Sequence, residues 1–296
     1  MESQEVTVSA IITTHNRCDL VKRAIDSALG QSVELKEVIV VDDASTDGTQ
    51  AVVSAIPDVN YIRIDAKDSN GGNHARNLGL MVAKGKYVAF LDDDDYWTQD
   101  KLASQVAVAE RSEAGVVLCG MTREIIGDDG DIKFVDDIDN RHSDIWPRNM
   151  SHEIFCAIPS VTSCVLFKRD TLLEIGGFDE SLTSWQEYEL LIRLAQITRF
   201  SYVPRSQVIY RQSASDKHRI SNKYFSWIDS VRRIESKHHK LISGLPIRCR
   251  ISFAIVKLTD AVGRARDAGM PIRSAFMQAE NIILRTIRKA LTTFQK

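Results

Sequence analysis

The sequence lacks any run of apolar residues long enough to cross a membrane as a helix. Such a helix needs roughly 18 consecutive apolar residues, and polar or charged residues interrupt every apolar stretch of this chain well before that length. The acidic residues 1–5 lead directly into a predicted strand, which is unlike a signal or transit peptide. We therefore expect a cytoplasmic chain without a membrane span.

Cysteine is also scarce. The five cysteines are odd in number, widely scattered and never in a CxxC arrangement: Cys18, Cys119, Cys156, Cys164 and Cys249. A disulfide framework or a structural zinc site needs paired or closely spaced cysteines. The pattern predicts reduced thiols, which again favours the cytoplasm.

The small net charge hides two oppositely charged regions. Residues 1–210 contain 20 Lys and Arg against 34 Asp and Glu, which gives −14, whereas residues 211–296 contain 18 against 6, which gives +12. A basic region of this kind favours an anionic surface or partner. No nucleic-acid-binding motif is recognisable, so we expect no nucleic-acid partner, and the anionic face of a membrane fits the charge equally well.

Strand-like and helix-like segments alternate over the first 120 residues. Strands are predicted at 6–13, 37–41, 59–64, 87–91 and 115–119, and helices at 19–31, 48–55, 73–83 and 99–111. Asp19 is the expected N-cap of the first helix. This alternation predicts right-handed βαβ units in a mostly parallel sheet, and hence an α/β fold.

The later sequence is less regular and then entirely helical. We expect a hairpin turn at 128–130, a loop at 136–150, strands at 163–167, 201–203 and 207–210, helices at 171–175 and 185–196, and only helices beyond 221, with breaks at 244–246 and 269–271. The predicted domains are therefore an α/β domain at 1–212 and a basic helical region at 213–296. The last helix could lie on a membrane interface, or pack on its own domain or on a second copy in a homodimer.

Polar clusters follow three of the predicted strands, at residues 13–17, 42–43 and 92–95. Ligands bind at the carboxyl ends of strands in a parallel sheet, so these clusters predict a site there. The acidic run, Asp92 to Asp95, brings like charges within a few ångströms of one another, which is costly unless a cation lies among them. Hard divalent cations take oxygen ligands, so the acidic run predicts a metal and a phosphorylated substrate.

Five motifs, in this order, resemble those of the family 2 glycosyltransferases, which have the GT-A fold. They are VSAIITTHNR at 8–17, VIVVDDASTDGT at 38–49, NGGNHARNLG at 70–79, GKYVAFLDDDD at 85–95, and GGFDE at 176–180 followed by QEYELLIRL at 186–194. No single motif is decisive, but five in register are specific. They cover about residues 6–212 and leave the helical tail uncovered. The resemblance implies a GT-A core and an inverting transfer from a nucleotide-sugar donor.

The resemblance also implies which residues bind the donor. Thr13 and His15 would lie near the nucleobase and the ribose, with His15 standing where the family often has Tyr, and Arg17 would belong to the same donor site. Asp43 would accept a hydrogen bond from the base, which favours uracil and hence a UDP-sugar. Arg76 would reach the base or the diphosphate and stabilise the charge of the leaving group.

The acidic run looks like the family's DXD motif. Asp94 would ligate Mn²⁺ or Mg²⁺ on the donor diphosphate, Asp92 and Asp93 would hold the ribose or support the metal, and Asp95 would only begin the next turn. Similar enzymes often close the site with a loop that follows the last core strand, where His218 lies. His218 is therefore a further candidate metal or phosphate ligand, although a lone loop histidine is more often just solvated.

Glu187 is the expected catalytic base, which would deprotonate the acceptor hydroxyl so that a single displacement inverts the anomeric carbon. The family usually has an Asp there, as the second member of a Glu-Asp pair, and here the aligned pair is Gln186-Glu187. Alternatively, Glu187 only stabilises the start of its helix, and Glu189 is a weaker candidate base. Trp185 could carry the acceptor sugar or could simply be buried.

Three functions remain open from the sequence. The leading one is a metal-dependent inverting transferase that moves a glucose- or galactose-type hexose from a UDP-sugar to a glycan acceptor. That acceptor would be a lipid-linked O-antigen or capsule repeat unit, at the inner face of the cytoplasmic membrane. The second is a catalytically inactive nucleotide-sugar-binding scaffold, suggested by the altered Gln186-Glu187 pair but opposed by the intact acidic run. The third is a nucleotidyltransferase, which usually has a glycine-rich loop where residues 13–17 contain no glycine.

Overall fold

A computed structural model of the chain describes residues 6–127, 129–138, 148–157, 160–213 and 224–293. It divides into two compact units. The first contains the described residues within Met1–Asn149, Ser160–Glu180 and Ile197–Ser215, and the second contains those within Met150–Pro159, Ser181–Gln196 and Asp216–Lys296. The domain boundary at residue 212 stays a prediction, because compactness alone does not show which segments fold independently.

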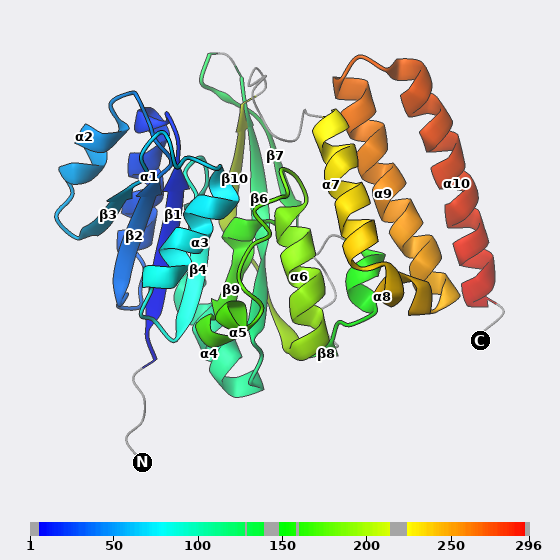
Figure 1. Cartoon of the computed structure of the whole chain (residues 1–296), viewed down its shortest axis with the longest axis horizontal. Helices are drawn as coiled ribbons and strands as arrows, with labels where there is room; N and C mark the ends of the chain where they lie inside the picture. Colours follow the sequence, from blue (N-terminus) through cyan, green and yellow to red (C-terminus); the bar gives the residue numbers. More distant parts are fainter. Residues whose placement is uncertain (1–5, 128, 139–147, 158–159, 214–223, 294–296) are drawn as a thin grey trace. The chain divides into compact units, whose positions relative to one another are not determined.

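The first unit is built on one mixed sheet whose strands follow the order β3-β2-β1-β4-β9-β6-β10-β5, with β7 paired to β6 and β8 to β10 (Figure 1). The strands are β1 (Val8–Thr14), β2 (Glu37–Asp42), β3 (Val59–Arg63), β4 (Tyr87–Asp92), β5 (Tyr96–Trp97), β6 (Val116–Ile126), β7 (Ile132–Ile138), β8 (Arg148–Asn149), β9 (Val165–Lys168) and β10 (Arg199–Ser213). Strands β1 to β4 are mutually parallel, as predicted, whereas β9 runs antiparallel to both β4 and β6. The carboxyl ends of four neighbouring strands therefore open on one edge.

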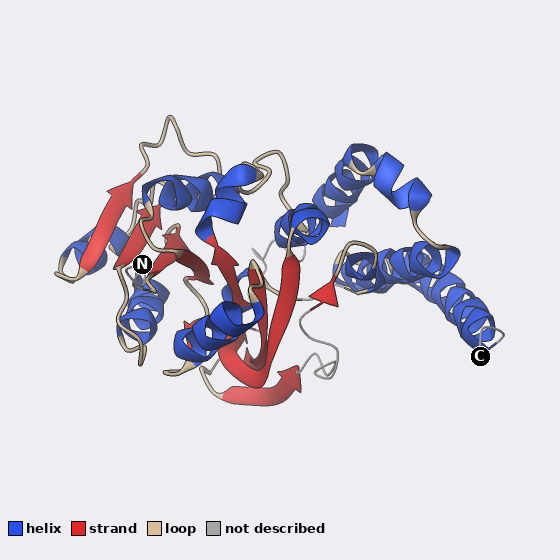
Figure 2. Cartoon of the chain, turned by 90° about the horizontal axis from the view of Figure 1, so that it is seen from below, coloured by secondary structure: helices blue, strands red, loops and turns tan. Residues whose placement is uncertain are grey.

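Helices cover both faces of the parallel strands, as Figure 2 shows. They are α1 (Cys18–Leu29), α2 (Thr49–Ser54), α3 (Gly72–Val82), α4 (Lys101–Ser112) and α5 (Arg169–Glu174). Val21 and Ile25 of α1 share a core cluster with Ile12 of β1. Helix α3 approaches Ile11 instead, through Gly79, where a Cβ would lie 2.5 Å from Ile11 Cγ2. Because successive strand residues point to opposite faces, α1 and α3 pack on different sides of β1.

Three local predictions for the first unit were wrong. The two short strands predicted at 201–203 and 207–210 form the single strand β10, and its register shifts between Val203 and Ser206 show that the apparent break is an irregularity within one strand. The hairpin turn predicted at 128–130 is confirmed by the antiparallel pairing of β6 with β7, but β6 extends to Ile126 instead of ending at 119, and β7 reaches Ile138, inside the predicted loop at 136–150. Asp19 lies within the first turn of α1 and does not cap it, since Arg17 precedes the helix.

The second unit consists of helices and loops. After the 3₁₀ helix Glu153–Cys156 come α6 (Gln186–Ile197), which ends in the first unit, α7 (Tyr224–Lys237), α8 (His239–Gly244), α9 (Ile247–Asp267) and α10 (Pro271–Thr293). Trp185 has edge-to-face contacts with Tyr188 and Trp227, at centroid distances of 5.1 and 5.6 Å. The helix breaks predicted at 244–246 and 269–271 are confirmed. Among the described residues, no helix has both the length and the hydropathy required to cross a membrane.

Candidate active site

The three polar clusters do meet at one edge of the sheet. Thr14 lies opposite Asp42 in the pairing of β1 with β2, and Thr13 lies opposite Asp92 in the pairing of β1 with β4. The backbone N–H of Asp43 donates to the carbonyl oxygen of Thr14 at 2.9 Å, which continues the β1–β2 contact beyond the strands. The prediction that strand ends gather these residues is confirmed.

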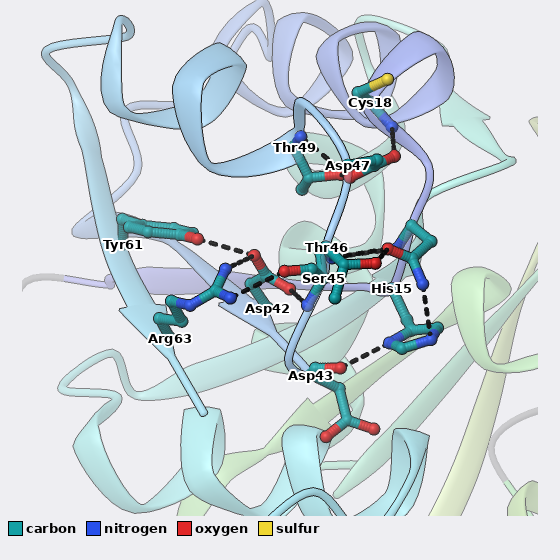
Figure 3. Close-up of polar contacts among 11 residues, drawn as sticks. His15, Cys18, Asp42, Asp43, Ser45, Thr46, Asp47, Thr49, Tyr61 and Arg63 are labelled. Carbon is teal, nitrogen blue, oxygen red and sulfur yellow. Dashed lines mark hydrogen bonds and ion pairs between the residues drawn. The ribbon is translucent and has the colours of Figure 1, made fainter. Parts of the chain in front are cut away.

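The loops that follow β1 and β2 are tied together by hydrogen bonds (Figure 3). The Nδ1 atom of His15 lies 2.5 Å from the carbonyl oxygen of Asp43. The side-chain oxygen of Asn16 accepts from the backbone N–H of Thr46 at 2.7 Å, and the backbone N–H of Asn16 donates to Ser45 Oγ at 2.8 Å. Asn16 has a φ of +52°, in the left-handed region that a non-glycine residue adopts only at a cost. These hydrogen bonds hold the two loops together beside Asp43.

Asp42 holds the loop after β2 in place through hydrogen bonds that Figure 3 also shows. Its side chain is fully buried and accepts from Tyr61 Oη at 2.6 Å, from Arg63 Nη1 at 3.3 Å and from the backbone N–H of Ser45 at 2.8 Å. Arg63 also donates to the carbonyl oxygen of Ser45 at 2.7 Å. Burial, together with the bond to Asp42, raises the pKa of Tyr61 to about 12. Asp42 is fully engaged within the protein and holds the loop in place.

Asp43, the next residue, has a carboxylate whose hydrogen bonds are only partly satisfied within the protein. It is 7% exposed, and its Oδ2 accepts from the backbone N–H of Gly71 at 3.0 Å. Its Oδ1 is buried, and no partner for it exists among the residues that the structure describes. A buried acceptor without a partner costs about 1–3 kcal/mol, so this oxygen is suited to accept a hydrogen bond from a ligand.

Two arginines contact the acidic run. Arg76 Nη2 lies 2.6 Å from Asp92 Oδ1, and Arg17 Nη1 lies 2.7 Å from Asp94 Oδ2 and 3.4 Å from Asp93 Oδ1. The sequence placed both arginines in the donor site, and the structure brings both to the carboxylates. These are strong charge-assisted contacts between groups that a phosphorylated ligand would also engage.

Burial alternates along the acidic run. Asp93 and Asp95 are buried, while the side chains of Asp92 and Asp94 are 32% and 27% exposed. Burial raises the pKa of Asp93 to about 7; Arg17 opposes this rise, and the charge of Asp94 adds to it. The arginines therefore compensate only part of the negative charge of the acidic run.

Asp95 was expected only to begin a turn, and this was wrong for its side chain. Its backbone N–H does bond to the carbonyl oxygen of Asp92, at 3.1 Å, as a turn requires. Its carboxyl group, however, is fully buried and accepts from Ser163 Oγ at 2.6 Å. Burial, reinforced by the charges of Asp94 and Asp92, raises its pKa well above the usual range.

The carboxylates of Asp92 and Asp94 suit a divalent cation held jointly with a phosphorylated ligand. No group of three or more His, Cys, Asp or Glu side chains that could hold a metal was found in the described part of the chain. Mg²⁺, however, is commonly bound through one or two carboxylates plus substrate phosphates. The partly exposed pair fits that arrangement. His218 lies outside the described residues.

Glu187 and Glu189 have different environments in the second unit. Glu187 is half-buried in the first turn of α6, directly after Trp185 and Gln186. Trp185 has a φ of +57°, is 4% exposed and donates to Asp260 Oδ2 at 2.7 Å. Of the two alternatives left open for Trp185, the structure supports a buried ring and opposes a platform for the acceptor sugar. The catalytic role of Glu187 stays a prediction.

Glu189 is fully buried beside two cations and a histidine. Its carboxylate lies 2.7 Å from Arg193 Nη2, 2.8 Å from Lys237 Nζ and 3.0 Å from His238 Nε2. Burial alone would raise its pKa, but the bonds from His238, Arg193 and Lys237 outweigh burial and lower it to about 2. This arrangement suits a structural ion pair and opposes the weaker prediction that Glu189 is the base.

Two residues near the acidic run were missed from the sequence. Arg23 of α1 donates to the carbonyl oxygen of Asp94 at 2.7 Å and lies over the ring of Tyr96. Ser163 accepts from the backbone N–H of Asp92 at 3.2 Å, besides donating to Asp95. Arg23 resembles any surface arginine of a helix. Ser163 lies far along the chain from its partners, so no local signal marks it.

A family model described as glycosyl transferase family 2 matches residues 9–173, which is more than half of the chain. The chain belongs to glycosyl transferase family 2. It is 41% identical over 103 residues to the UDP-Glc:α-D-GlcNAc-diphosphoundecaprenol β-1,3-glucosyltransferase WfaP of Escherichia coli, a match that covers 35% of this chain and 41% of WfaP. It is 40% identical over 113 residues to the succinoglycan biosynthesis protein ExoO of Rhizobium meliloti, covering 38% of this chain and 32% of ExoO. The matches thus span less than half of either relative.

Solved structures support the fold. The mannosyltransferase PcManGT of Pyrobaculum calidifontis, in complex with GDP-Man and Mn²⁺, matches with a TM-score of 0.60 at 20% identity, covering 97% of this chain and 83% of PcManGT. TarS 1–349 of S. aureus, in complex with UDP, matches with a TM-score of 0.54 at 18% identity, covering 97% and 91%. At such identities the likeness concerns the fold, and it confirms the predicted GT-A architecture with a helical C-terminal region.

Proposed function

We propose that this chain is a metal-dependent, inverting glycosyltransferase that moves a hexose from a UDP-sugar to a glycan acceptor. One observation carries the proposal. An unpaired buried oxygen of Asp43 and the incompletely compensated acidic run lie at neighbouring strand ends of one sheet. The first suits a nucleobase N–H, and the second suits a diphosphate with its cation. Together they match the two ends of a nucleoside diphosphate.

The donor would lie across these strand ends. The N–H of uracil would donate to Asp43 Oδ1, while Thr13 and the exposed ring of His15 would border the base and ribose. Both the N3–H of uracil and the N1–H of guanine can donate to such an acceptor, and the similarity to WfaP, whose name specifies UDP-Glc, favours uracil. Arg17 and Arg76 would bind the donor phosphates in exchange for some of their bonds to the acidic run. The arginines would thus be positioned before the donor arrives.

The acidic run would hold Mn²⁺ or Mg²⁺ together with the diphosphate. Asp94 and Asp92 are the proposed ligands, with Asp93 as their buried support, and His218 is a further candidate. When bound, the cation would neutralise the charge that develops on the leaving UDP. The structural likeness to an enzyme in complex with Mn²⁺ supports a divalent cation here.

Glu187 would accept the proton of the acceptor hydroxyl. The acceptor oxygen then forms a bond to the anomeric carbon as the bond from that carbon to the diphosphate oxygen breaks, and the configuration inverts. A lipid-linked surface glycan, reached at the inner face of the cytoplasmic membrane, is the proposed acceptor. The similarity to WfaP, whose name specifies UDP-Glc and a diphosphoundecaprenol acceptor, supports both this acceptor and a glucose-type donor.

A donor screen monitored by nucleotide release tests the proposal. We expect release of UDP from a UDP-hexose, little release from GDP- or ADP-sugars, loss of turnover in EDTA and recovery on adding Mn²⁺. Turnover that EDTA leaves unchanged would remove the metal from the mechanism. Tight UDP-sugar binding with no release, even with a lipid-linked acceptor, would instead indicate the inactive scaffold.

A further inference from the structure

The residue that precedes α6 has an unusual backbone conformation. Trp185 has a φ of +57°, in the left-handed region, where a bulky residue is a marked outlier. Its carbonyl oxygen accepts from the backbone N–H of Glu189 at 2.9 Å, and this hydrogen bond opens α6. The backbone torsions of Trp185 therefore set the direction in which the chain enters the helix that carries Glu187.

Side chains of α7 and α9 hold Trp185 in this conformation. Its indole N–H donates to Asp260 Oδ2 of α9 at 2.7 Å, and Arg264 Nε lies 2.9 Å from the same oxygen. The guanidinium of Arg264 lies over the ring of Trp227 in α7, and Trp227 in turn has its edge-to-face contact with Trp185. These four side chains form a closed network within the second unit. A strained backbone persists only where its surroundings determine it in this way.

The bond to Asp260 does more than apolar packing requires. A ring that only filled the core could be buried from an ordinary backbone conformation, whereas a short bond to a charged acceptor also fixes how the indole is turned. Glu187 follows Trp185 by two residues and is half-buried in the first turn of α6. A movement of Trp185 is therefore passed directly to the carboxylate of Glu187. A general base must lie within hydrogen-bond distance of its proton, and small misplacements slow such reactions strongly.

We infer that Trp185 is a positioning residue for the transfer reaction, held by Asp260 and acting through Glu187. The inference rests on the proposed function, in which Glu187 is the base. It gives α9, which lies outside the residues 9–173 that the family model matches, a part in the reaction besides packing. It also gives the left-handed backbone of Trp185 a purpose, because strained residues concentrate at functional sites.

A double-variant cycle with Glu187 tests this role. Trp185→Phe keeps a buried ring but removes the N–H, and it is introduced into wild type and into Glu187→Gln. Asp260→Ala breaks the same bond from the other side, while Asp260→Asn keeps an acceptor oxygen. The matched control is Glu235→Ala, which removes the ion pair of Glu235 in α7 with Lys257 in α9 and leaves the partners of Trp185 in place.

The rate is measured as UDP release from the UDP-hexose that the donor screen selects, with GlcNAc-diphosphoundecaprenol as acceptor. We expect Trp185→Phe and Asp260→Ala to lower kcat at least about tenfold, with the KM for the donor within about twofold of wild type. Asp260→Asn and the control Glu235→Ala should stay within about threefold of wild type. In the Glu187→Gln background, Trp185→Phe should have no further effect, because the group through which it acts is gone.

Two results would overturn the inference while leaving Glu187 as the base. One is a kcat near that of wild type in both Trp185→Phe and Asp260→Ala. The other is an equal loss from Trp185→Phe in both backgrounds, since a purely structural role slows every background alike. Transfer at the wild-type rate by Glu187→Gln would instead contradict the proposed base, and the inference with it. Thermal unfolding of each variant shows that it is folded under the assay conditions, and Asp260→Ala replaces Trp185→Phe in the cycle if the latter is not.

Discussion

The acidic run of the first unit and the buried carboxylate Glu189 of the second differ in how completely their partners compensate the negative charge. In the acidic run, Arg17 and Arg76 contact three of the four aspartates, yet the pKa of Asp93 is raised to about 7 and that of Asp95 well above its usual range. In the second unit, one carboxylate, Glu189, is paired with the cations Arg193 and Lys237 and contacts His238, and its pKa is lowered to about 2.

The difference distinguishes a binding site from a structural ion pair. A carboxylate that the protein fully compensates gains nothing further from a cation and stabilises the fold. Carboxylates that the protein leaves partly uncompensated cost stability until a ligand supplies the missing charge, and such groups concentrate at functional sites. We therefore interpret the acidic run as functional and the Glu189 cluster (Glu189 with Arg193, Lys237 and His238) as structural.

Glu187 lies two residues from Glu189 and gives the sharpest contrast with it. Glu187→Gln keeps the size of the side chain but removes the base, so we expect transfer to fall by about 10³-fold, within the usual range for general base catalysis. Nucleotide release with acceptor present measures this. Glu187→Asp should retain far more activity, and near wild-type transfer by Glu187→Gln would remove the base assignment.

Glu189→Gln should act on stability. It leaves Arg193, Lys237 and His238 around a neutral side chain, and the lowered pKa of Glu189 corresponds to about 3 kcal/mol at neutral pH. Denaturant unfolding of the full chain should show a loss of this order. The matched change Asp94→Asn should leave the unfolding free energy of the donor-free protein nearly unchanged. Equal losses in the two variants would erase the distinction between the clusters.

Acid should weaken the Glu189 cluster specifically. The pKa of Glu189 is about 2 in the folded chain, against an ordinary value of 4.5, so its stabilisation is complete above about pH 5 and is lost as the pH falls toward 2. By pH 3 the loss should be about 2 kcal/mol, measured as the difference between wild type and Glu189→Gln. A difference that stays constant from pH 7 to about pH 3 contradicts the role of this carboxylate.

Asp42 and Asp43, at the end of β2, repeat the comparison between a carboxylate with partners for both oxygens and one with a free oxygen. Asp43→Asn replaces the free Oδ1 or its partner oxygen with a donor, so we expect the KM for the UDP-sugar to rise about tenfold with kcat little changed. Asp42→Asn, which weakens bonds to Tyr61 and Arg63, should instead lower the melting temperature. If Asp43→Asn leaves the KM unchanged, the base-recognition role fails.

The sequence was sufficient to predict the parallel half of the sheet and the grouping of Asp43, Arg17 and Arg76 at one edge of it. Strand ends of βαβ units meet by topology, so local patterns were enough there. The long strand β10 was not predicted, because a register irregularity near Pro204 is indistinguishable in the sequence from a loop between two strands.

The sequence also could not predict which carboxylates have partners that compensate their charge. It depends on partners distant in the chain, such as Ser163 for Asp95 and His238 for Glu189. Asp95 therefore looked like a turn residue, and Glu189 looked like a candidate base. Only packing shows which carboxylates have partners.

The most direct test of the account is calorimetric titration of UDP into the full chain, with and without Mn²⁺, for wild type and Asp94→Asn. If the acidic run lacks charge that a cation supplies, Mn²⁺ should tighten UDP binding to wild type at least roughly tenfold and should have little effect on Asp94→Asn. Equal UDP affinity with and without Mn²⁺ in wild type, or an undiminished Mn²⁺ effect in Asp94→Asn, would contradict it.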